Sequence, residues 1–152
     1  MTVPWAKMPD GEILVGLVHE HRPNMGPVKT LSPPGGFVDA GESREQAQRR
    51  ESVEEGGLDT GGAVPLPGLP VNSDRLYLVQ DATKDEGMHM YHIEVAFDRL
   101  EQVGPSLWRP KKDVIRHKKE SDLYFHPWRE AVDLSADALG LAAIAKLMTI
   151  LI

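Results

Sequence analysis

Three glutamates fall within five positions of the chain, at Glu51, Glu54 and Glu55. Residues three and four apart are neighbours on a helix, with Cβ atoms about 5–6 Å apart, so Glu54 and Glu55 come round to the side that carries Glu51. Gathering like charges destabilises a fold unless a positive group lies between them, and a hard divalent cation with oxygen ligands fits that position. The spacing therefore predicts a carboxylate metal site, and the absence of cysteine excludes thiolate ligands.

Magnesium suits these ligands best, and manganese is a second candidate. Magnesium keeps several waters and is usually shared between a few carboxylates and the oxygens of a phosphate substrate. Arg50 precedes the cluster, and its guanidinium can hold a carboxylate through two parallel hydrogen bonds. This combination of residues indicates a site for a pyrophosphate.

Residues 36–58 resemble the signature of the Nudix hydrolase family. In that signature a glycine is followed six positions later by a glutamate. After a spacer come Arg-Glu, a hydrophobic residue, any residue, Glu-Glu, any residue, a glycine and a hydrophobic residue. Ser52 departs from it, because the family has an aliphatic residue there. The matching positions are Gly36, Glu42, Arg50, Glu51, Glu54, Glu55, Gly57 and Leu58.

The resemblance implies an α/β fold, a Nudix-type α/β/α sandwich with a mixed β-sheet, in which the signature forms a loop-helix-loop. It also implies that Glu51, Glu54 and Glu55 bind Mg²⁺ and that Gly36 and Glu42 complete the metal-binding motif. The chemistry would be attack of water on a phosphorus atom, with the metal neutralising charge. An exposed helix laced with charges would explain the composition of this segment but not its spacing.

Residues outside the signature supply further candidates. Glu120 lies in the loop before the last predicted strand and is our candidate general base, with Glu86 and Glu94 as alternatives. Arg22 either contacts a substrate phosphate or pairs with Glu20, and Phe37 either stacks on a nucleobase or joins the core. The residues expected to act in catalysis are Glu51, Glu54, Arg50 and Glu120, and those expected to contact substrate are Arg22 and Phe37.

Several elements must position this motif. Asp10-Gly11 separates two apolar segments, which predicts a β-hairpin. Four prolines between residues 23 and 34 predict an irregular loop that ends at Gly35-Gly36. The segment that follows has no proline, and it predicts a helix capped by Ser43 and ended by Gly56-Gly57.

Downstream of the motif, strands are predicted at residues 75–80 and 90–97, joined as a second hairpin, and at residues 122–126. Residues 105–119 are basic and predict an irregular segment. A terminal helix is expected after the cap Ser135-Ala136-Asp137. Its end is apolar almost all round, so a homodimer interface is a further hypothesis.

Composition limits the class of protein. With 152 residues and 41% hydrophobic content, the chain fits a single domain spanning residues 1–152. The net charge of −6 disfavours a broad nucleic-acid-binding surface. No apolar stretch is long enough to span a membrane, and residues 1–10 lack a signal-peptide layout, so we expect a cytoplasmic protein.

These observations favour a magnesium-dependent hydrolase that acts on a small nucleotide. We expect a nucleoside diphosphate derivative as substrate, with ADP-ribose or a nucleotide sugar favoured because Arg22-Pro23 faintly resembles the lead-in of ADP-ribose enzymes. The alternatives are a nucleoside triphosphate pyrophosphatase and a Nudix module that binds nucleotides without cleaving them.

Overall fold

The apolar run at residues 13–18 lies in strand β2 (Ile13–His21), which is buried throughout that run. Strand β2 pairs antiparallel with β1 (Thr2–Lys7). The turn between them contains Gly11, whose φ of 94° lies in the left-handed region that glycine tolerates, and Gly11 N donates to Met8 O at 2.9 Å. The first predicted hairpin is confirmed.

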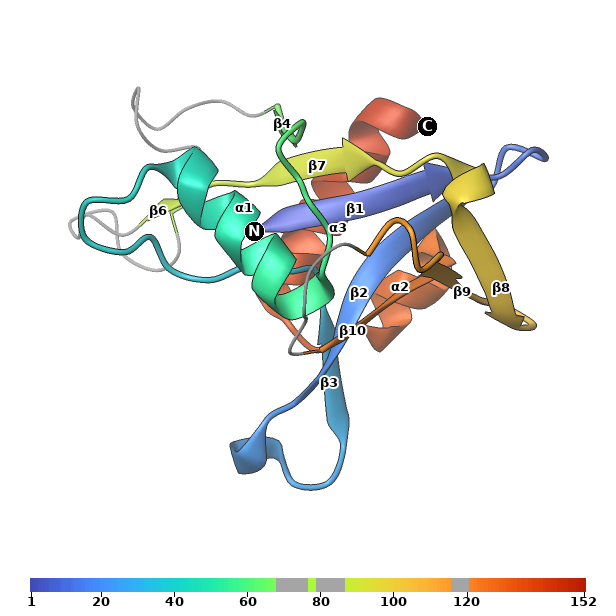
Figure 1. Cartoon of the computed structure of the whole chain (residues 1–152), viewed down its shortest axis with the longest axis horizontal. Helices are drawn as coiled ribbons and strands as arrows, with labels where there is room; N and C mark the ends of the chain where they lie inside the picture. The colour runs from blue at the N-terminus through green and yellow to red at the C-terminus, as the bar shows by residue number, and fades with distance from the viewer. Residues whose placement is uncertain (68–76, 79–86, 116–120) are drawn as a thin grey trace.

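A mixed sheet forms the centre of the computed structural model, which describes residues 1–67, 77–78, 87–115 and 121–152 (Figure 1). Its other strands are β3 (Lys29–Ser32), β4 (Val64–Pro65), β7 (Tyr91–Glu94), β8 (Leu100–Gly104), β9 (Leu107–Pro110) and β10 (Asp122–Pro127). Across the described residues the strand order is β4-β7-β1-β2-β10-β9-β8, with β3 also paired to β2. Strands β1 and β7 run parallel, and the other neighbours run antiparallel.

Helix α1 (Arg44–Gly56) follows the glycine loop and has defined caps at both ends. Ser43 accepts from Gln46 N at 3.1 Å, and the Gln46 side chain accepts from Ser43 N at 2.8 Å, which completes a capping box. Gly57 ends the helix in a left-handed conformation, with a φ of 69°. The predicted Ser43 cap and glycine stop are both confirmed.

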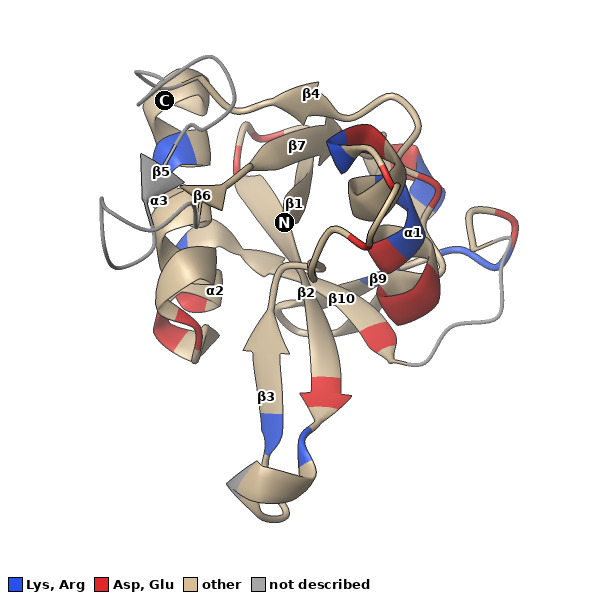
Figure 2. Ribbon diagram, turned by 90° about the vertical axis from the view of Figure 1, so that its left-hand side faces the viewer, with Lys and Arg blue, Asp and Glu red and all other residues tan. Residues whose placement is uncertain are grey.

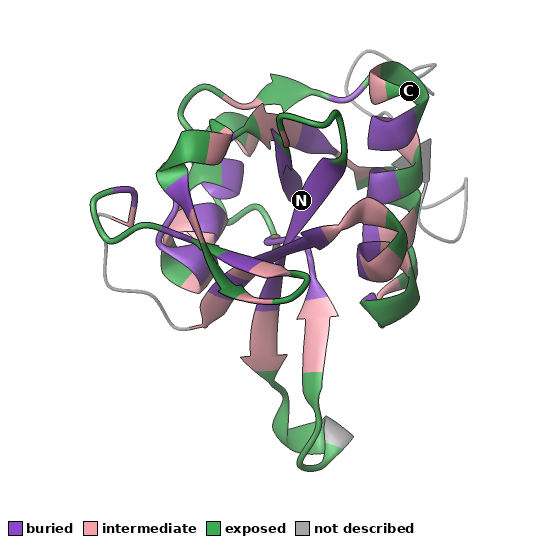
Figure 3. Cartoon of the chain, turned by 90° about the vertical axis from the view of Figure 1, so that its right-hand side faces the viewer, coloured by how far each residue is buried: buried purple, intermediate pink, exposed green. Residues whose placement is uncertain are grey.

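The helices form two layers, one on each face of the sheet. Helix α1 covers one face, and α2 (Trp128–Leu134) and α3 (Ala138–Leu151) cover the other (Figures 1 and 2). Asp137 caps α3 by accepting from Leu139 N at 2.9 Å, as the sequence predicted. Buried residues concentrate in the sheet and on the sheet-facing sides of the helices (Figure 3). The predicted α/β/α sandwich is confirmed.

Several of the described elements were not predicted, among them β4 and β8. The proline-rich segment contains a 3-10 turn (Pro23–Met25) and β3, because residues 29–32 lie between prolines and are free to pair with β2. The basic segment contains β9, where Trp108 is buried against β10. Helix α2 has no side-chain cap at Pro127, so the usual start signal is missing.

The second predicted hairpin is wrong in its pairing. Strand β5 (Tyr77–Leu78) pairs with β6 (Gly87–Met88) in a separate small sheet, whereas β7 joins the main sheet beside β1. A short isolated hairpin is marginal in water, and pairing with a central strand satisfies the β7 backbone better. In the described ranges, no helix is both long and apolar enough to cross a membrane.

Candidate metal centre and substrate cleft

The glycine loop presses its backbone against the acidic face of α1. Gly35 N donates to Glu55 Oε2 at 2.8 Å. A methyl group placed on Gly36 would overlap the carboxylate of Glu51. At Gly35 a side chain would instead overlap the backbone of Met1, so both glycines are needed, one to clear Met1 and one to clear the Glu51 carboxylate. The glycine loop predicted before the helix therefore contacts two of the three glutamates, Glu55 and Glu51.

Arg50 ties the loop to the helix. Its guanidinium grips Glu42 with Nε–Oε1 at 2.9 Å and Nη2–Oε2 at 3.0 Å, and Nη2 also donates to Phe37 O at 3.0 Å. Its Nη1 reaches Glu51 Oε1 at 2.7 Å and Glu54 Oε2 at 3.3 Å. The bonds to Glu42 and then Glu51 raise the pKa of Arg50, so it stays charged. The two parallel hydrogen bonds expected for Arg50 are made to Glu42.

Negative charge is crowded on the inner side of α1. Burial is the main reason that the pKa of Glu55 rises to about 7, and the charges of Glu51 and Glu20 act in the same direction. The hydrogen bond from Gly35 opposes this rise. Glu54, by contrast, has a side chain that is 48% exposed. A carboxyl group whose pKa is raised in this way is one that a bound cation would help to ionise.

The donor chemistry of these residues fits a hard divalent cation, since it consists only of carboxylate and backbone oxygens. No three His, Asp or Glu side chains in the described ranges are already gathered around one point. Arg50 instead contacts Glu51 and Glu54. Metal binding through these two carboxylates must compete with Arg50.

A cleft of about 540 Å³ opens beside Glu51. Its size falls within the range of small-molecule sites. Phe37 lies on its wall with 90% of its surface exposed, so its ring is not part of the core. On another wall, Arg44 Nη1 lies 3.2 Å from His89 Nε2. The lining residues are Met1, Gly35, Gly36, Phe37, Val38, Arg44, Ala47, Gln48, Glu51, Gly87, Met88, His89, Tyr91, Asp137 and Leu139.

Of the other candidate residues that the structure describes, Arg22 and Glu94 do not line this cleft. Arg22 donates to Glu20 at 2.8 Å, so the paired alternative is the one that the structure shows. Glu120 and Glu86 lie outside the described residues. Glu94 lies on β7 and is exposed. The general base thus stays a prediction.

The sequence interpretation missed Arg44 and His89. Arg44 and Glu51 are seven residues apart, which places them on the same side of a helix, about 10 Å apart along its axis. That spacing was a readable signal for Arg44. His89 lies between β6 and β7, 45 residues further along the chain than Arg44, and no local pattern marks it.

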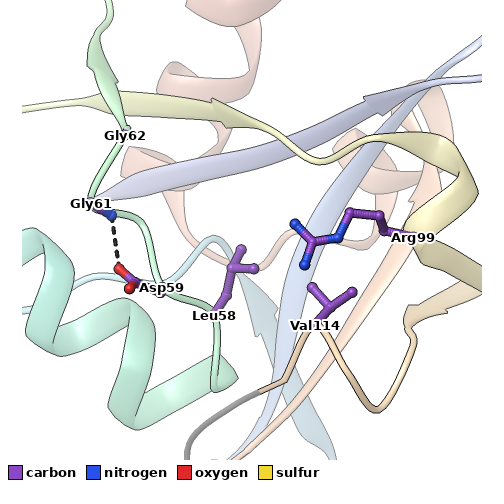
Figure 4. Close-up of a pocket in the computed structure, with 6 residues that line it drawn as sticks. All are labelled: Leu58, Asp59, Gly61, Gly62, Arg99 and Val114. Carbon is purple, nitrogen blue, oxygen red and sulfur yellow. Dashed lines mark hydrogen bonds between the residues drawn. The ribbon is translucent and has the colours of Figure 1, made fainter.

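A second hollow, of about 370 Å³, lies beyond the C-terminal end of α1 (Figure 4). Arg99 reaches across Leu58 and Val114 there, and the turn at Asp59 and Gly61 forms the opposite side. None of the glutamates of the motif lines it. The cleft beside Glu51 is therefore the better candidate for a site that joins metal to substrate.

Comparisons with known proteins identify the family of this chain. The family model described as the NUDIX domain matches residues 7–128. Enzymes of that family generally use divalent metal ions. No curated protein matches the chain.

Solved structures share the fold at low identity. An Ap4A hydrolase from C. elegans is 18% identical, with a TM-score of 0.59 over 99% of this chain and 95% of that one. The NUDIX domain of Shewanella oneidensis NrtR, solved with ADP ribose, is 18% identical, with a TM-score of 0.61 over 99% of this chain and 85% of that one. A mutT/nudix family protein from Listeria innocua is 20% identical, with a TM-score of 0.60 over 98% of this chain and 89% of that one. With the family model matching most of its length, this chain belongs to the Nudix hydrolase family.

Proposed function

We propose that this protein is a magnesium-dependent hydrolase that cleaves the pyrophosphate bond of a nucleoside diphosphate derivative. The observation that carries the proposal is the position of Glu51. Its carboxylate packs on Gly36 and also lines the 540 Å³ cleft. A metal held there would face a substrate lying in the cleft.

Each residue of the motif has a role in this proposal. Glu51, Glu54 and Glu55 hold Mg²⁺, with Mn²⁺ as a substitute, and the backbone of Gly36 leaves room for Glu51. Glu42 keeps Arg50 in place through its two hydrogen bonds. A bound magnesium ion supplies positive charge to the phosphate oxygens and lowers the pKa of water. Glu120 is the proposed general base.

Phe37 is proposed to stack on the nucleobase. An exposed phenyl ring beside a cleft of this volume is suited to a planar aromatic group. Arg22, in the β2–β3 connection, is paired with Glu20 but is near enough to Glu55 for their charges to interact. We propose that it leaves Glu20 to contact a phosphate of a substrate bound at the glutamates. ADP-ribose or a nucleotide sugar is the favoured substrate, and the structural relative solved with ADP ribose supports testing it first.

A hydrolysis panel tests the proposal. Purified protein is given Mg²⁺ and, separately, ADP-ribose, nucleotide sugars, dinucleoside polyphosphates and nucleoside triphosphates, and products are separated by chromatography. We expect a nucleoside monophosphate from at least one diphosphate derivative, and none when Mg²⁺ is chelated. Glu54→Gln should lower kcat by at least about 100-fold.

The matched control is Glu101→Gln, which removes a carboxylate that pairs with Arg109 on the β8–β9 hairpin, outside the cleft. It should leave turnover unchanged. Absence of turnover of every substrate, together with unchanged nucleotide binding in Glu54→Gln, would support the binding-module alternative instead.

A further inference from the structure

Helix α1 has little apolar surface with which to hold its place on the sheet. Its buried residues are Ala47, Gln48, Ser52 and Gly56, so Ala47 is the only buried apolar side chain with appreciable volume. Ser52, which stands where the family has an aliphatic residue, is fully buried and donates to Gln48 O at 2.8 Å. This hydrogen bond lies within the helix and therefore fixes nothing outside it. The hydrophobic effect alone is a weak means of positioning this helix.

Gln48 instead joins the helix to its surroundings through directed hydrogen bonds. Its Oε1 accepts from Thr2 Oγ1 at 3.0 Å and from Thr60 Oγ1 at 2.8 Å. Its Nε2 donates to Thr60 O at 3.0 Å. Thr2 and Thr60 are fully buried, and Gln48 is 8% exposed. Buried hydrogen bonds of this kind favour one arrangement, because any shift leaves a polar atom unsatisfied.

The two partners of Gln48 belong to segments outside α1. Thr2 lies on β1, and its N donates to Pro34 O at 2.8 Å, one residue before the glycine that holds Glu55. Thr60 lies in the turn between α1 and β4, and its O also accepts from Ala63 N at 2.9 Å. The neighbouring Asp59 accepts from Gly61 N at 3.0 Å (Figure 4) and twice from Arg49 of α1 at 2.9 Å, which holds this turn against the helix. Gln48 thus connects the glycine loop, strand β1 and the turn after α1.

We propose that Gln48 is a positioning residue for the metal centre. Through Thr2 and Thr60 it fixes α1 along and about its axis, so that Glu51 and Glu55 meet Gly36 and Gly35. The side chain at position 48 must accept hydrogen bonds from two hydroxyl groups and donate one to a carbonyl at the same time. Glutamine can do both. Glutamate has no N–H group to donate to the carbonyl, and methionine cannot replace any of the three hydrogen bonds. This inference depends on the proposed function, because it assumes that the glutamates bind a cation.

The test measures metal binding by calorimetry rather than activity. Mn²⁺ is titrated into the wild-type protein and into Gln48→Met, at a temperature where circular dichroism shows both to be fully folded. We expect Mn²⁺ to bind about tenfold more weakly to Gln48→Met, as is usual when a supporting residue of a metal site is lost. Thr2→Val and Thr60→Val keep the shape of each residue and remove one hydroxyl each, so they should weaken binding by smaller factors. Gln48→Met with Thr2→Val should bind like Gln48→Met alone.

Ile144→Val is the control, because Ile144 is fully buried in the cluster on the α2 and α3 side of the sheet. It should lower Tm, because it removes a buried methyl group far from α1, and should leave Mn²⁺ affinity unchanged. If Gln48→Met does not fold, the two valine variants carry the test. Equal Mn²⁺ affinity in the wild type and the folded variants would overturn the role of Gln48. No Mn²⁺ binding by the wild type would overturn the proposed function itself.

Discussion

The Glu51 carboxylate leaves no space for a side chain at position 36. Gly36→Ala should therefore displace either the loop or Glu51, while the capped helix and the sheet remain. We expect kcat of the Mg²⁺-dependent reaction to fall by at least about 100-fold, since small misplacements of a catalytic group have effects of this size. Kinetics with the best substrate of the panel, together with circular dichroism, checks this. Gly62→Ala is the control, because a methyl group there meets nothing within 4 Å; equal loss in both variants would show that the Gly36 effect is not specific.

Phe37 offers a second test at the residue scale. Phe37→Ala removes the exposed ring but keeps the carbonyl that accepts from Arg50. Because stacking of one base contributes about 1–3 kcal/mol, KM for a nucleotide substrate should rise roughly 5- to 150-fold with little change in kcat. Steady-state kinetics measures both constants. An unchanged KM would show that the base does not contact Phe37.

The placement of residues that are close together in the sequence could be predicted. Glu51, Glu54 and Glu55 lie within two helical turns, so a single helix determines which side they share. Gln48 could not be assigned a role, because its partners Thr2 and Thr60 come from elsewhere in the chain. Long-range contacts of this kind depend on the tertiary fold, which one sequence does not display.

At the scale of elements, the capping box at the start of α1 should stabilise the helix, and removing its cap residue tests this. Ser43→Ala removes the hydroxyl that accepts from Gln46 N. We expect a loss of about 1 kcal/mol in the free energy of unfolding, and a Tm lower by about 2–4 °C. Thermal unfolding followed by circular dichroism measures the change. Ser43→Asp keeps an acceptor at the cap and should unfold near the wild-type temperature; if it is destabilised as much as the alanine variant, the cap hydrogen bond is not the cause.

Helix α1 and the first hairpin were predicted because the residues at their ends are typical of helix caps or turns. Helix α1 has a serine cap and a glycine stop, and the first hairpin has Asp10-Gly11 at its turn. Strand β3 and helix α2 lack such signals, and they form because the sheet offers an edge or an apolar face. Their existence is decided by packing, and therefore by the whole chain.

On the scale of the whole molecule, a histidine pair under α2 links stability to pH. His19 Nε2 on β2 lies 3.1 Å from His126 Nε2 on β10, and Glu130 of α2 lies 3.6 Å from the other ring nitrogen of His126. Burial, together with His126 and Lys29, lowers the pKa of His19 to about 4, while Asp122 opposes this. Burial also lowers the pKa of His126, against the effect of Glu130. Both imidazoles are therefore neutral in the folded protein at neutral pH.

The sign of the pH effect follows from these shifts. Above the ordinary histidine pKa of 6.5, neither state is protonated and stability is unaffected. As pH falls from 6.5 towards 4, the unfolded chain takes up protons that the folded chain does not, so folding becomes less favourable. We expect His19 to contribute a loss of about 1 kcal/mol by pH 5, after allowance for its partial exposure.

Urea unfolding at pH 7.5 and pH 5 measures this loss. The wild type should lose more stability between the two pH values than His19→Gln does. His21→Gln, which changes an exposed histidine on the same strand, should behave like the wild type. Equal pH dependence in the wild type and His19→Gln would contradict the account of the pair.

The central claim is that Glu51, Glu54 and Glu55 form one metal centre, beside the cleft that Glu51 lines. Electron paramagnetic resonance of Mn²⁺ tests it most directly, because free Mn²⁺ gives a strong six-line signal that weakens on binding. The signal should decrease when wild-type protein or Glu101→Gln is added, and should remain when Glu51→Gln or Glu55→Gln is added, with circular dichroism showing every variant folded. Undiminished binding of Mn²⁺ by the Glu51→Gln and Glu55→Gln variants, or no binding by the wild type, would contradict the claim.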